Sequence, residues 1–329
     1  MSQIRFGIVI PQGWRNDLPQ TSARNQFKYS KDIIVAAERN GFDSVYAYDH
    51  FIPHYRYPSA GNFFECFTLL SAISSYTKKL KIGQIVTCNS YRNPALLAKM
   101  VATLDIITNG RTELGIGAGW YQEEYKAYGY TYFSDIIRIL QLKESIQIIK
   151  KLWTQEIANF RGKYYSVNRA ICFPKPIQKP NPTIMVGGAG EKYLLKVVAK
   201  YADRYNLYFG TPQEMERKIN ILKDYNTQNR KIEYSIVLPC LIVDNDKEIE
   251  KIVKRMKKGN MTIDQFKKSV AGGLTVGTVD DIMNGISQYM NIGVTHFIFH
   301  FLHLDQRVLK KFSRIIRVAS SKKNMISSI

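Results

Sequence analysis

Short apolar runs alternate with longer segments of helical periodicity along most of the chain. The first two apolar runs, residues 5–10 and 44–49, predict buried strands. Residues 27–40 and 63–77 carry apolar side chains at helical spacing, and Gly41 ends the first of these helices. Strands and helices in regular alternation are typical of a parallel sheet with crossover helices.

The helix with the clearest boundaries follows the third predicted strand, residues 81–87. Asn93 can cap its first turn, Pro94 suits the first helical position, and Gly110 comes just after its end. Its apolar face contains Leu97, Met100, Val101, Leu104 and Ile107. These signals predict an amphipathic helix packed on the sheet.

The alternation continues through the second half of the chain. Further strands are predicted at residues 112–117, 183–186, 204–209, 234–243 and 295–301. Helices are predicted over a long region that ends near Trp153 and over residues 192–202, 212–228, 247–270 and 305–318. One more helix starts at Thr278, where Asp281 completes an approximate capping box, and ends at Gly293.

Eight strand–helix repeats predict a closed (β/α)₈ barrel, the TIM-barrel fold. An open doubly wound sheet is the alternative, and it favours a glycine-rich turn directly after the first strand. That position here reads Pro11-Gln12-Gly13-Trp14, which is not a dinucleotide-binding pattern, so the barrel is favoured. We expect residues 1–320 to form one domain and residues 321–329 to form a frayed tail.

Two segments interrupt the repeat and are interpreted as insertions. Residues 160–167 predict a small hairpin with its turn at Arg161-Gly162, before strand five. An extended connector follows the hairpin and is marked by Pro174, Pro176, Pro180 and Pro182. After strand seven, the charged residues 247–270 predict a helical insertion.

The formal net charge of +20 allows three interpretations: a nucleic-acid partner, an anionic membrane surface, or a basic surface around an anionic ligand. The densest basic clusters lie at residues 247–258, 267–268 and 310–323. They interleave with apolar residues at helical spacing, which indicates solvated helix faces. Since no RNA- or DNA-binding motif is present, we expect no nucleic-acid partner.

Membrane and secretion signals are weak. No apolar run reaches the roughly 18 residues that a membrane span needs, and the first apolar stretch is too short for a signal peptide. The four cysteines are far apart and form no CxxC pair, so neither a zinc site nor a disulfide framework is expected. We therefore expect a cytoplasmic protein with reduced thiols and without a membrane partner.

Functional groups of such a barrel lie just after the carboxyl ends of the strands. Asp49 and His50 follow the second strand, and a histidine there can donate, accept or move a proton near neutral pH. Adjacent strand residues point to opposite faces, so the two side chains need not meet. A packed, hydrogen-bonded histidine is the structural alternative.

Two glycine-rich segments also follow strands. Gly187-Gly188-Ala189-Gly190 precedes a helix, where backbone N–H groups can approach a phosphate closely; a tight turn is the alternative. The run from Gly115 to Trp120 suits a flat ring lying against the backbone as well as a phosphate pattern.

Two further segments bear on the site. The small polar residues 85–90 can line a pocket at the end of strand three. His296 and His300 are four residues apart, but their context is strand-like and lacks a carboxylate pattern. We therefore expect no metal site.

Taken together, these segments resemble the bacterial-luciferase-like flavin family over nearly the whole chain. The motifs that carry the resemblance are Tyr48-Asp49-His50-Phe51, residues 91–99, residues 115–121, residues 186–191 and Gly277-Thr278. The opening residues 5–8 and 11–14 resemble the branch that uses the deazaflavin coenzyme F420.

The resemblance implies a flavin-type ring at the mouth of a (β/α)₈ barrel. It implies a non-proline cis peptide at Ile85–Val86, in the third-strand bulge that backs the ring together with Thr87 and Cys88. It also implies a proton relay at His50. The cofactor-binding residues that it implies are Asp49, Ala118, Gly119, Gly187, Gly188, Ala189, Gly190 and Glu191.

One departure from the family concerns the substrate. Some deazaflavin-dependent sugar dehydrogenases of this family carry a glutamate acid–base where this chain has Trp120, and a ligand-contacting asparagine is replaced by Glu123. We therefore do not expect this chain to share the sugar substrate of those dehydrogenases. We expect Trp14, Trp120, Tyr121 and Glu123 to line the pocket of an unknown small-molecule substrate.

Three functions follow as hypotheses. The first is a coenzyme F420-dependent oxidoreductase that transfers a hydride between ring carbon C5 and the substrate, with His50 handling a proton. The second is an FMN-dependent monooxygenase that uses reduced flavin and oxygen. The third is a non-enzymatic flavin-binding or nucleic-acid-binding protein. The resemblance also implies a homodimer.

Overall fold

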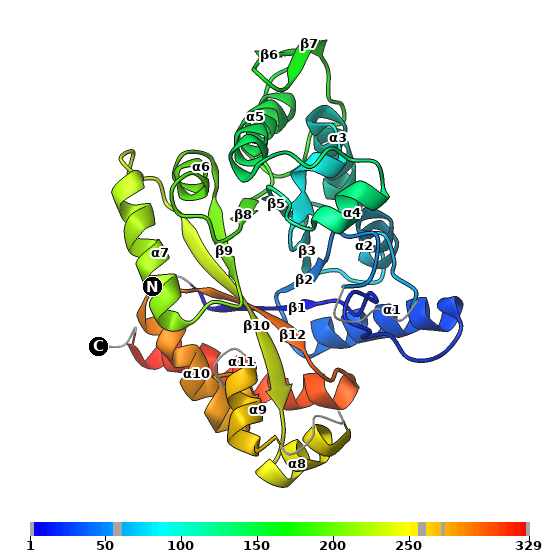
Figure 1. The fold of residues 1–329 in the computed structure, drawn as a ribbon, viewed down its shortest axis with the longest axis vertical. Helices are drawn as coiled ribbons and strands as arrows, with labels where there is room; N and C mark the ends of the chain where they lie inside the picture. Colours follow the sequence, from blue (N-terminus) through cyan, green and yellow to red (C-terminus); the bar gives the residue numbers. More distant parts are fainter. Residues whose placement is uncertain (1–2, 55–60, 256–260, 271–273, 327–329) are drawn as a thin grey trace.

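The computed structural model describes residues 3–54, 61–255, 261–270 and 274–326. Parallel strands form a ring that helices cover on the outside (Figure 1). The strands of the ring are β1 (Arg5–Val9), β2 (Ser44–Ala47), β3 (Lys81–Gln84), β4 (Thr87–Cys88), β5 (Leu114–Gly117), β8 (Ile184–Gly187), β9 (Arg204–Tyr208), β10 (Glu233–Ile242) and β12 (His296–Phe301). Their alternation with helices confirms the predicted (β/α)₈ barrel.

The ring closes through the third strand, which is split into β3 and β4. β3 pairs with β2, whereas β4 pairs with β5, so the strand changes neighbours across residues 85 and 86. The Ile85–Val86 peptide bond between the two halves is cis, as the resemblance implied. A bridge between Ile82 and Thr112 ties the early half to the strand that follows.

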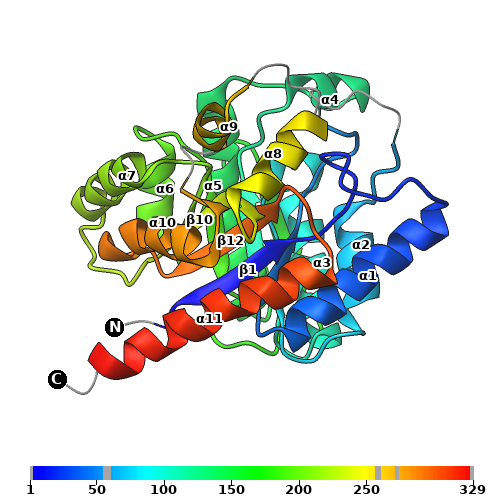
Figure 2. The ribbon, with the colours of Figure 1, turned by 90° about the horizontal axis from the view of Figure 1, so that it is seen from below.

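The helices pack their apolar faces on the outside of the ring (Figures 1 and 2). The covering helices are α1 (Ala23–Arg39), α2 (Cys66–Ser74), α3 (Pro94–Ile107), α5 (Asp135–Thr154), α6 (Leu194–Tyr201), α7 (Pro212–Tyr225), α10 (Val279–Asn291) and α11 (Gln306–Ile326). Asn93 caps α3 through a hydrogen bond from the Ala95 N–H, and Pro94 is its first residue, as predicted. Thr278 and Asp281 form the predicted capping box of α10.

Several predicted boundaries differ from the structure. The charged stretch 247–270 forms two helices, α8 (Asp246–Arg255) and α9 (Ile263–Ser269), because Thr262 and Gln265 form a capping box that starts a new helix. A short strand, β11 (Val276–Gly277), then pairs with β10. Helix α11 continues to Ile326, so residues 321–326 of the segment expected to be frayed are helical.

The insertion before strand five is a two-stranded hairpin. It comprises β6 (Ala158–Arg161) and β7 (Ser166–Ala170), and its turn lies over residues 162–165, where Gly162 donates to the Tyr165 carbonyl. The turn is therefore longer than the predicted Arg161-Gly162 pair. Figure 1 shows the hairpin beyond one end of α5, away from the ring.

A buried ionic network fills the amino-terminal end of the barrel. The Arg204 guanidinium donates to Glu113 at 2.7 Å and to Glu233 at 3.0 Å, and the Tyr46 hydroxyl donates to Glu113 at 2.6 Å. Burial alone would raise the pKa of Glu113, but Arg204 more than offsets it and holds this pKa well below its usual range. This end of the barrel is closed by paired charges, which leaves the opposite end for ligands.

The described residues lack two features that would indicate a membrane or a metal ligand. No helix among them is long and apolar enough to cross a membrane. No three of their histidine, cysteine, aspartate or glutamate side chains are grouped in a way that could hold a metal ion.

Candidate active site

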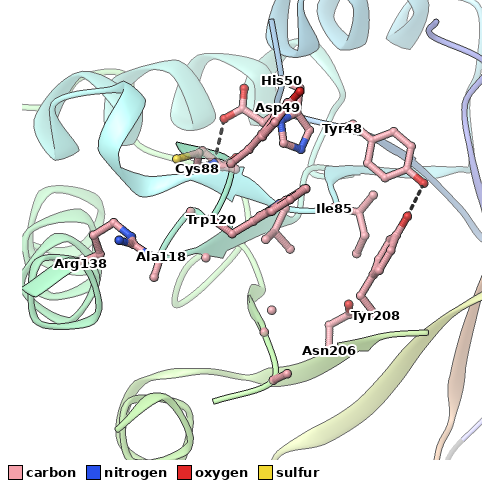
Figure 3. A pocket seen from close by; sticks show the side chains of 18 of the residues that line it. Tyr48, Asp49, His50, Ile85, Cys88, Ala118, Trp120, Arg138, Asn206 and Tyr208 are labelled. Atoms are coloured by element: carbon pink, nitrogen blue, oxygen red, sulfur yellow. Dashed lines mark hydrogen bonds between the residues drawn. The ribbon is translucent and has the colours of Figure 1, made fainter. Parts of the chain in front are cut away.

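A cavity of about 580 Å³ opens at the carboxyl ends of the strands, where this fold places its ligands. Its walls come from the segments that follow β1, β2, β3, β5, β8 and β9. The lining includes Trp14, Arg15, Tyr48, Asp49, His50, His54, Ile85, Val86, Thr87, Cys88, Ala118, Gly119, Trp120, Tyr121, Arg138, Gly187, Gly188, Ala189, Gly190, Asn206 and Tyr208. Figure 3 shows many of these side chains turned towards the same space.

His50 is held by a buried carboxylate. Its Nδ1 atom lies 2.8 Å from Glu124 Oε2, and Tyr91 Oη donates to the same oxygen at 2.6 Å. The second oxygen of Glu124 accepts the backbone N–H groups of Phe51 and Ile52. Burial opposes ionisation of Glu124, but the hydrogen bond from His50 and the other donors outweigh it and lower its pKa. Glu124 therefore orients the imidazole and balances a positive charge on it.

Aromatic rings surround His50. The Trp14 indole stacks on the imidazole with ring centroids 3.7 Å apart and an interplanar angle of 3°. Trp120 and Tyr121 meet the imidazole edge-on, each at 5.9 Å. Trp14 is buried, whereas Trp120 is 53% exposed at the mouth of the cavity. The three rings that sequence analysis assigned to the substrate pocket thus lie around His50.

Asp49 turns away from His50, as expected for neighbouring residues at a strand end. Its carboxylate accepts two hydrogen bonds from Arg92, at 2.7 and 2.9 Å, and one from the backbone N–H of Cys88. These contacts tie the second strand to the bulge of the third. Burial raises the pKa of Asp49, and Arg92 acts against this effect. Asp49 therefore supports the bulge that carries residues 85–88.

The glycine-rich turn after β8 forms a cradle without side chains. A Cβ atom added to Gly187 would lie 2.9 Å from Val86 Cγ1, and Gly188 has a φ of +145°, which favours glycine. Beneath the turn, Lys218 Nζ donates to the Ala189 carbonyl at 2.7 Å and to Glu191 at 3.1 Å. The turn is thus fixed from behind and presents backbone to the cavity.

The buried polar atoms on the cavity wall that have no hydrogen-bond partner among the described residues include Thr87 Oγ1 and Arg138 Nε. The rest of the Arg138 guanidinium is engaged, because it donates to the Phe133 carbonyl and to Asp135 and lies 4.1 Å from the Tyr132 ring centroid. Figure 3 shows this guanidinium pointing towards Ala118. Orphaned buried donors of this kind are typical of a binding site for a polar ligand.

Two residues assigned to the site by sequence lie outside the cavity lining. Glu123 is exposed, because it faces away from the barrel on α4 (Gln122–Ala127), and its buried neighbour Glu124 contacts His50 instead. Glu191 pairs with Lys218 and Arg217 and acts on the cradle only from behind. Glu123, which we expected in the substrate pocket, therefore does not line it, and Glu124 is the acid that contacts His50.

Arg138, Arg15 and Tyr208 also line the cavity, although the sequence did not indicate them. A small signal existed for Tyr208, since it is the last residue of a barrel strand. Arg138 sits in the first turn of α5, far from any strand end, and nothing in its local pattern distinguishes it from a surface arginine.

Residues 4–296 match the family described as luciferase-like monooxygenase. This chain belongs to that family. The match covers every strand of the barrel up to the start of β12, and it includes the bulge, the glycine cradle and His50.

Curated relatives of this family member use two cofactors. The F420-dependent glucose-6-phosphate dehydrogenase of Amycolatopsis mediterranei (strain U-32) is 28% identical, over 93% of this chain and 97% of that protein. The FMNH(2)-dependent dimethylsulfone monooxygenase of Pseudomonas putida is 33% identical, over 49% of this chain and 43% of that protein. Both relatives are oxidoreductases.

Solved structures share the fold at low sequence identity. An F420-dependent secondary alcohol dehydrogenase in complex with an F420-acetone adduct superposes with a TM-score of 0.79 at 21% identity, over 97% of this chain and 99% of that chain. The long-chain alkane monooxygenase LadA gives a TM-score of 0.80 at 13% identity, over 98% of this chain and 92% of that chain. These neighbours confirm the luciferase-like barrel.

Proposed function

We propose that this protein is a coenzyme F420-dependent oxidoreductase that transfers a hydride between the deazaflavin and a small organic substrate. The observation that carries the proposal is one cavity that joins a side-chain-free phosphate cradle to a carboxylate-held histidine. Similarity to an F420-dependent dehydrogenase over almost the full length of both chains supports the same cofactor.

The residues present fit a phosphate-bearing ring cofactor. The cradle of Gly187, Gly188 and Gly190 would receive the phosphate, and Arg138 would supply a charge-assisted hydrogen bond from its orphaned Nε. The Thr87 hydroxyl, which has no partner among the described residues, would form a hydrogen bond with a polar edge of the cofactor ring. When bound, the deazaflavin supplies a ring carbon that accepts or donates a hydride.

The protein itself would handle the proton that accompanies the hydride. Because Nδ1 of His50 faces Glu124, Nε2 is the nitrogen left to exchange a proton with a substrate oxygen. Glu124 is fixed by four donors, so the imidazole is held in one orientation throughout the reaction. Trp14, Trp120 and Tyr121 would exclude water around this nitrogen.

A titration with both cofactors tests the proposal. We expect purified protein to bind coenzyme F420 with submicromolar affinity, followed by tryptophan fluorescence because Trp14 and Trp120 line the cavity. Submicromolar binding of FMN with no response to the deazaflavin would contradict the proposal. That result would favour the second candidate, a monooxygenase, which the dimethylsulfone monooxygenase relative supports.

Replacing Arg138 by methionine tests the phosphate site. We expect Arg138→Met to weaken binding of FMN, or of coenzyme F420, at least about tenfold, since a charge-assisted hydrogen bond contributes about 1.5–3 kcal/mol. Riboflavin lacks the phosphate and serves as the matched ligand, and its weaker affinity should not change. Equal losses for FMN and riboflavin, measured by calorimetry, would place Arg138 at the ring or in the fold instead.

We further propose that the enzyme is a cytoplasmic homodimer with a small-molecule substrate and without a nucleic-acid partner. The family resemblance supports the dimer, and the four free buried cysteines are compatible with a reducing compartment. Light scattering coupled to size exclusion would test the dimer: a monomer mass at micromolar concentration would contradict it.

A further inference from the structure

The cavity has a second polar wall that the proposed function does not use. Tyr208 ends β9, Tyr48 directly follows β2, and His300 lies in β12, so three strand ends converge there. Tyr48 Oη lies 3.1 Å from Tyr208 Oη and 3.1 Å from His300 Nδ1. Figure 3 shows the Tyr48–Tyr208 pair on the opposite side of Trp120 from Arg138.

Arg15 completes this wall. Its Nη2 donates to Tyr208 Oη at 2.8 Å, and its guanidinium carbon lies 5.0 Å from the centroid of the Phe209 ring. The loop that carries Arg15 is held by Asp17, whose Oδ1 accepts the backbone N–H groups of Gly13 and Gln12. Arg15 and Tyr208 both line the cavity.

The charges on the cavity wall favour an anion at this place. Among the described residues, the lining acids are Asp49 and Asp135, and each is bound to another arginine, Arg92 and Arg138 respectively. The Arg15 guanidinium adds its charge beside the rings of Tyr208, which is 38% exposed, and Phe209, which is half-buried. The acid within electrostatic range of this guanidinium is Asp17, which belongs to the same loop. A guanidinium beside a hydroxyl is suited to bind a carboxylate.

His300 sets the direction of the hydrogen-bond chain. Burial lowers the pKa of His300 to about 3, with Arg15 acting in the same direction, so its imidazole is neutral and carries one proton. When that proton is on Nδ1, His300 donates to Tyr48 and Tyr48 donates to Tyr208. The Tyr208 oxygen then accepts hydrogen bonds from both Tyr48 and Arg15.

We propose that Arg15 and Tyr208 form a subsite for a carboxylate of the substrate, with Tyr48 and His300 as positioning residues. This subsite rests on the proposed function only because both proposals place their ligands in the same cavity. It narrows the substrate class to small carboxylic acids whose apolar part lies against Trp14 and Ile85. Arg138 lies on the other side of Trp120 and, with the glycine cradle of the same cavity, would remain for the cofactor.

Binding of benzoate, with benzamide as its neutral counterpart, tests the subsite. We expect the wild-type protein to bind benzoate more tightly than benzamide in calorimetry at fixed ionic strength, with and without cofactor. Arg15→Gln should raise the Kd of benzoate at least about tenfold, because it removes a charge-assisted hydrogen bond. Tyr208→Phe should reduce the preference for benzoate over benzamide. Arg24→Gln, an exposed arginine on α1, is the matched control and should change nothing.

The outcomes of these binding experiments test the carboxylate subsite independently of which cofactor the protein uses. Loss of benzoate binding in Arg138→Met but not in Arg15→Gln would overturn the subsite and assign the anion to the cradle. Equal affinity for benzoate and benzamide would also overturn it, whatever the cofactor titration shows. His300→Phe should lower the preference for benzoate, whereas a purely structural role would lower stability and leave this preference unchanged.

Discussion

Replacing His50 by alanine lowers the turnover number by about 10²–10⁴-fold, the usual contribution of general acid–base catalysis. Cofactor affinity should stay within a few-fold, because His50 contacts Glu124 and the aromatic rings rather than the glycine cradle. Stopped-flow measurement of the cofactor absorbance after mixing with substrate gives the rate. A variant that retains turnover within about threefold would remove His50 from the mechanism.

Glu124→Gln is the companion variant that separates proton transfer from packing. The amide cannot balance a positive imidazole, and its NH₂ group competes with the Nδ1–H for the same position. We expect a smaller loss of turnover than in His50→Ala, together with a changed pH profile. Tyr91→Phe, which removes one of the other donors to Glu124, is the matched control and should retain most of the activity.

Replacing Arg204 by methionine lowers the free energy of unfolding by about 3–5 kcal/mol, because it leaves Glu113 as an uncompensated buried charge. Both partners are almost fully buried, at 1% and 2% exposure of their side chains. Urea denaturation monitored by circular dichroism measures the change. Arg5→Met is the matched control: Arg5 and Glu233 are 24% and 31% exposed, so their pair should contribute about 1 kcal/mol or less.

The pH dependence of the Arg204→Met variant has a definite sign. In the wild type, Arg204 lowers the pKa of Glu113, so this carboxylate contributes stability above its unfolded pKa that is lost as the pH falls through the lowered folded value. Without Arg204, burial favours the protonated acid. The destabilisation of Arg204→Met should therefore be smaller near pH 4 than at pH 7. An equal loss of unfolding free energy at both pH values would contradict the conclusion that Arg204 keeps the buried Glu113 ionised.

Local patterns determined the elements and their order. Apolar runs of strand length, helix caps such as Asn93 and Thr278, and helix-ending glycines such as Gly41 act over a few residues, so the sequence displays them directly. Counting the repeats then predicted the barrel, and the strand ends predicted where His50 and the glycine cradle would lie. The family motifs added the cis peptide between Ile85 and Val86.

The predicted boundaries of helices and strands were wrong where the sequence carries a local signal that periodicity does not show. The capping box at Thr262 divides the charged stretch into two helices, although helical periodicity runs across it. The third strand changes neighbours at its bulge, which periodicity alone does not indicate.

Only the tertiary structure decided which side chains meet. Glu124 rather than Glu123 reaches His50, because adjacent positions on the helix α4 point in different directions and the packing of the helix on the barrel selects one of them. Arg15, Tyr48, Tyr208 and His300 come from four distant segments, so no local spacing relates them. The sequence by itself determined the barrel and the neighbourhood of its site. Closure of the ring determined the partners, since it brings into contact side chains that are separated by up to 252 residues.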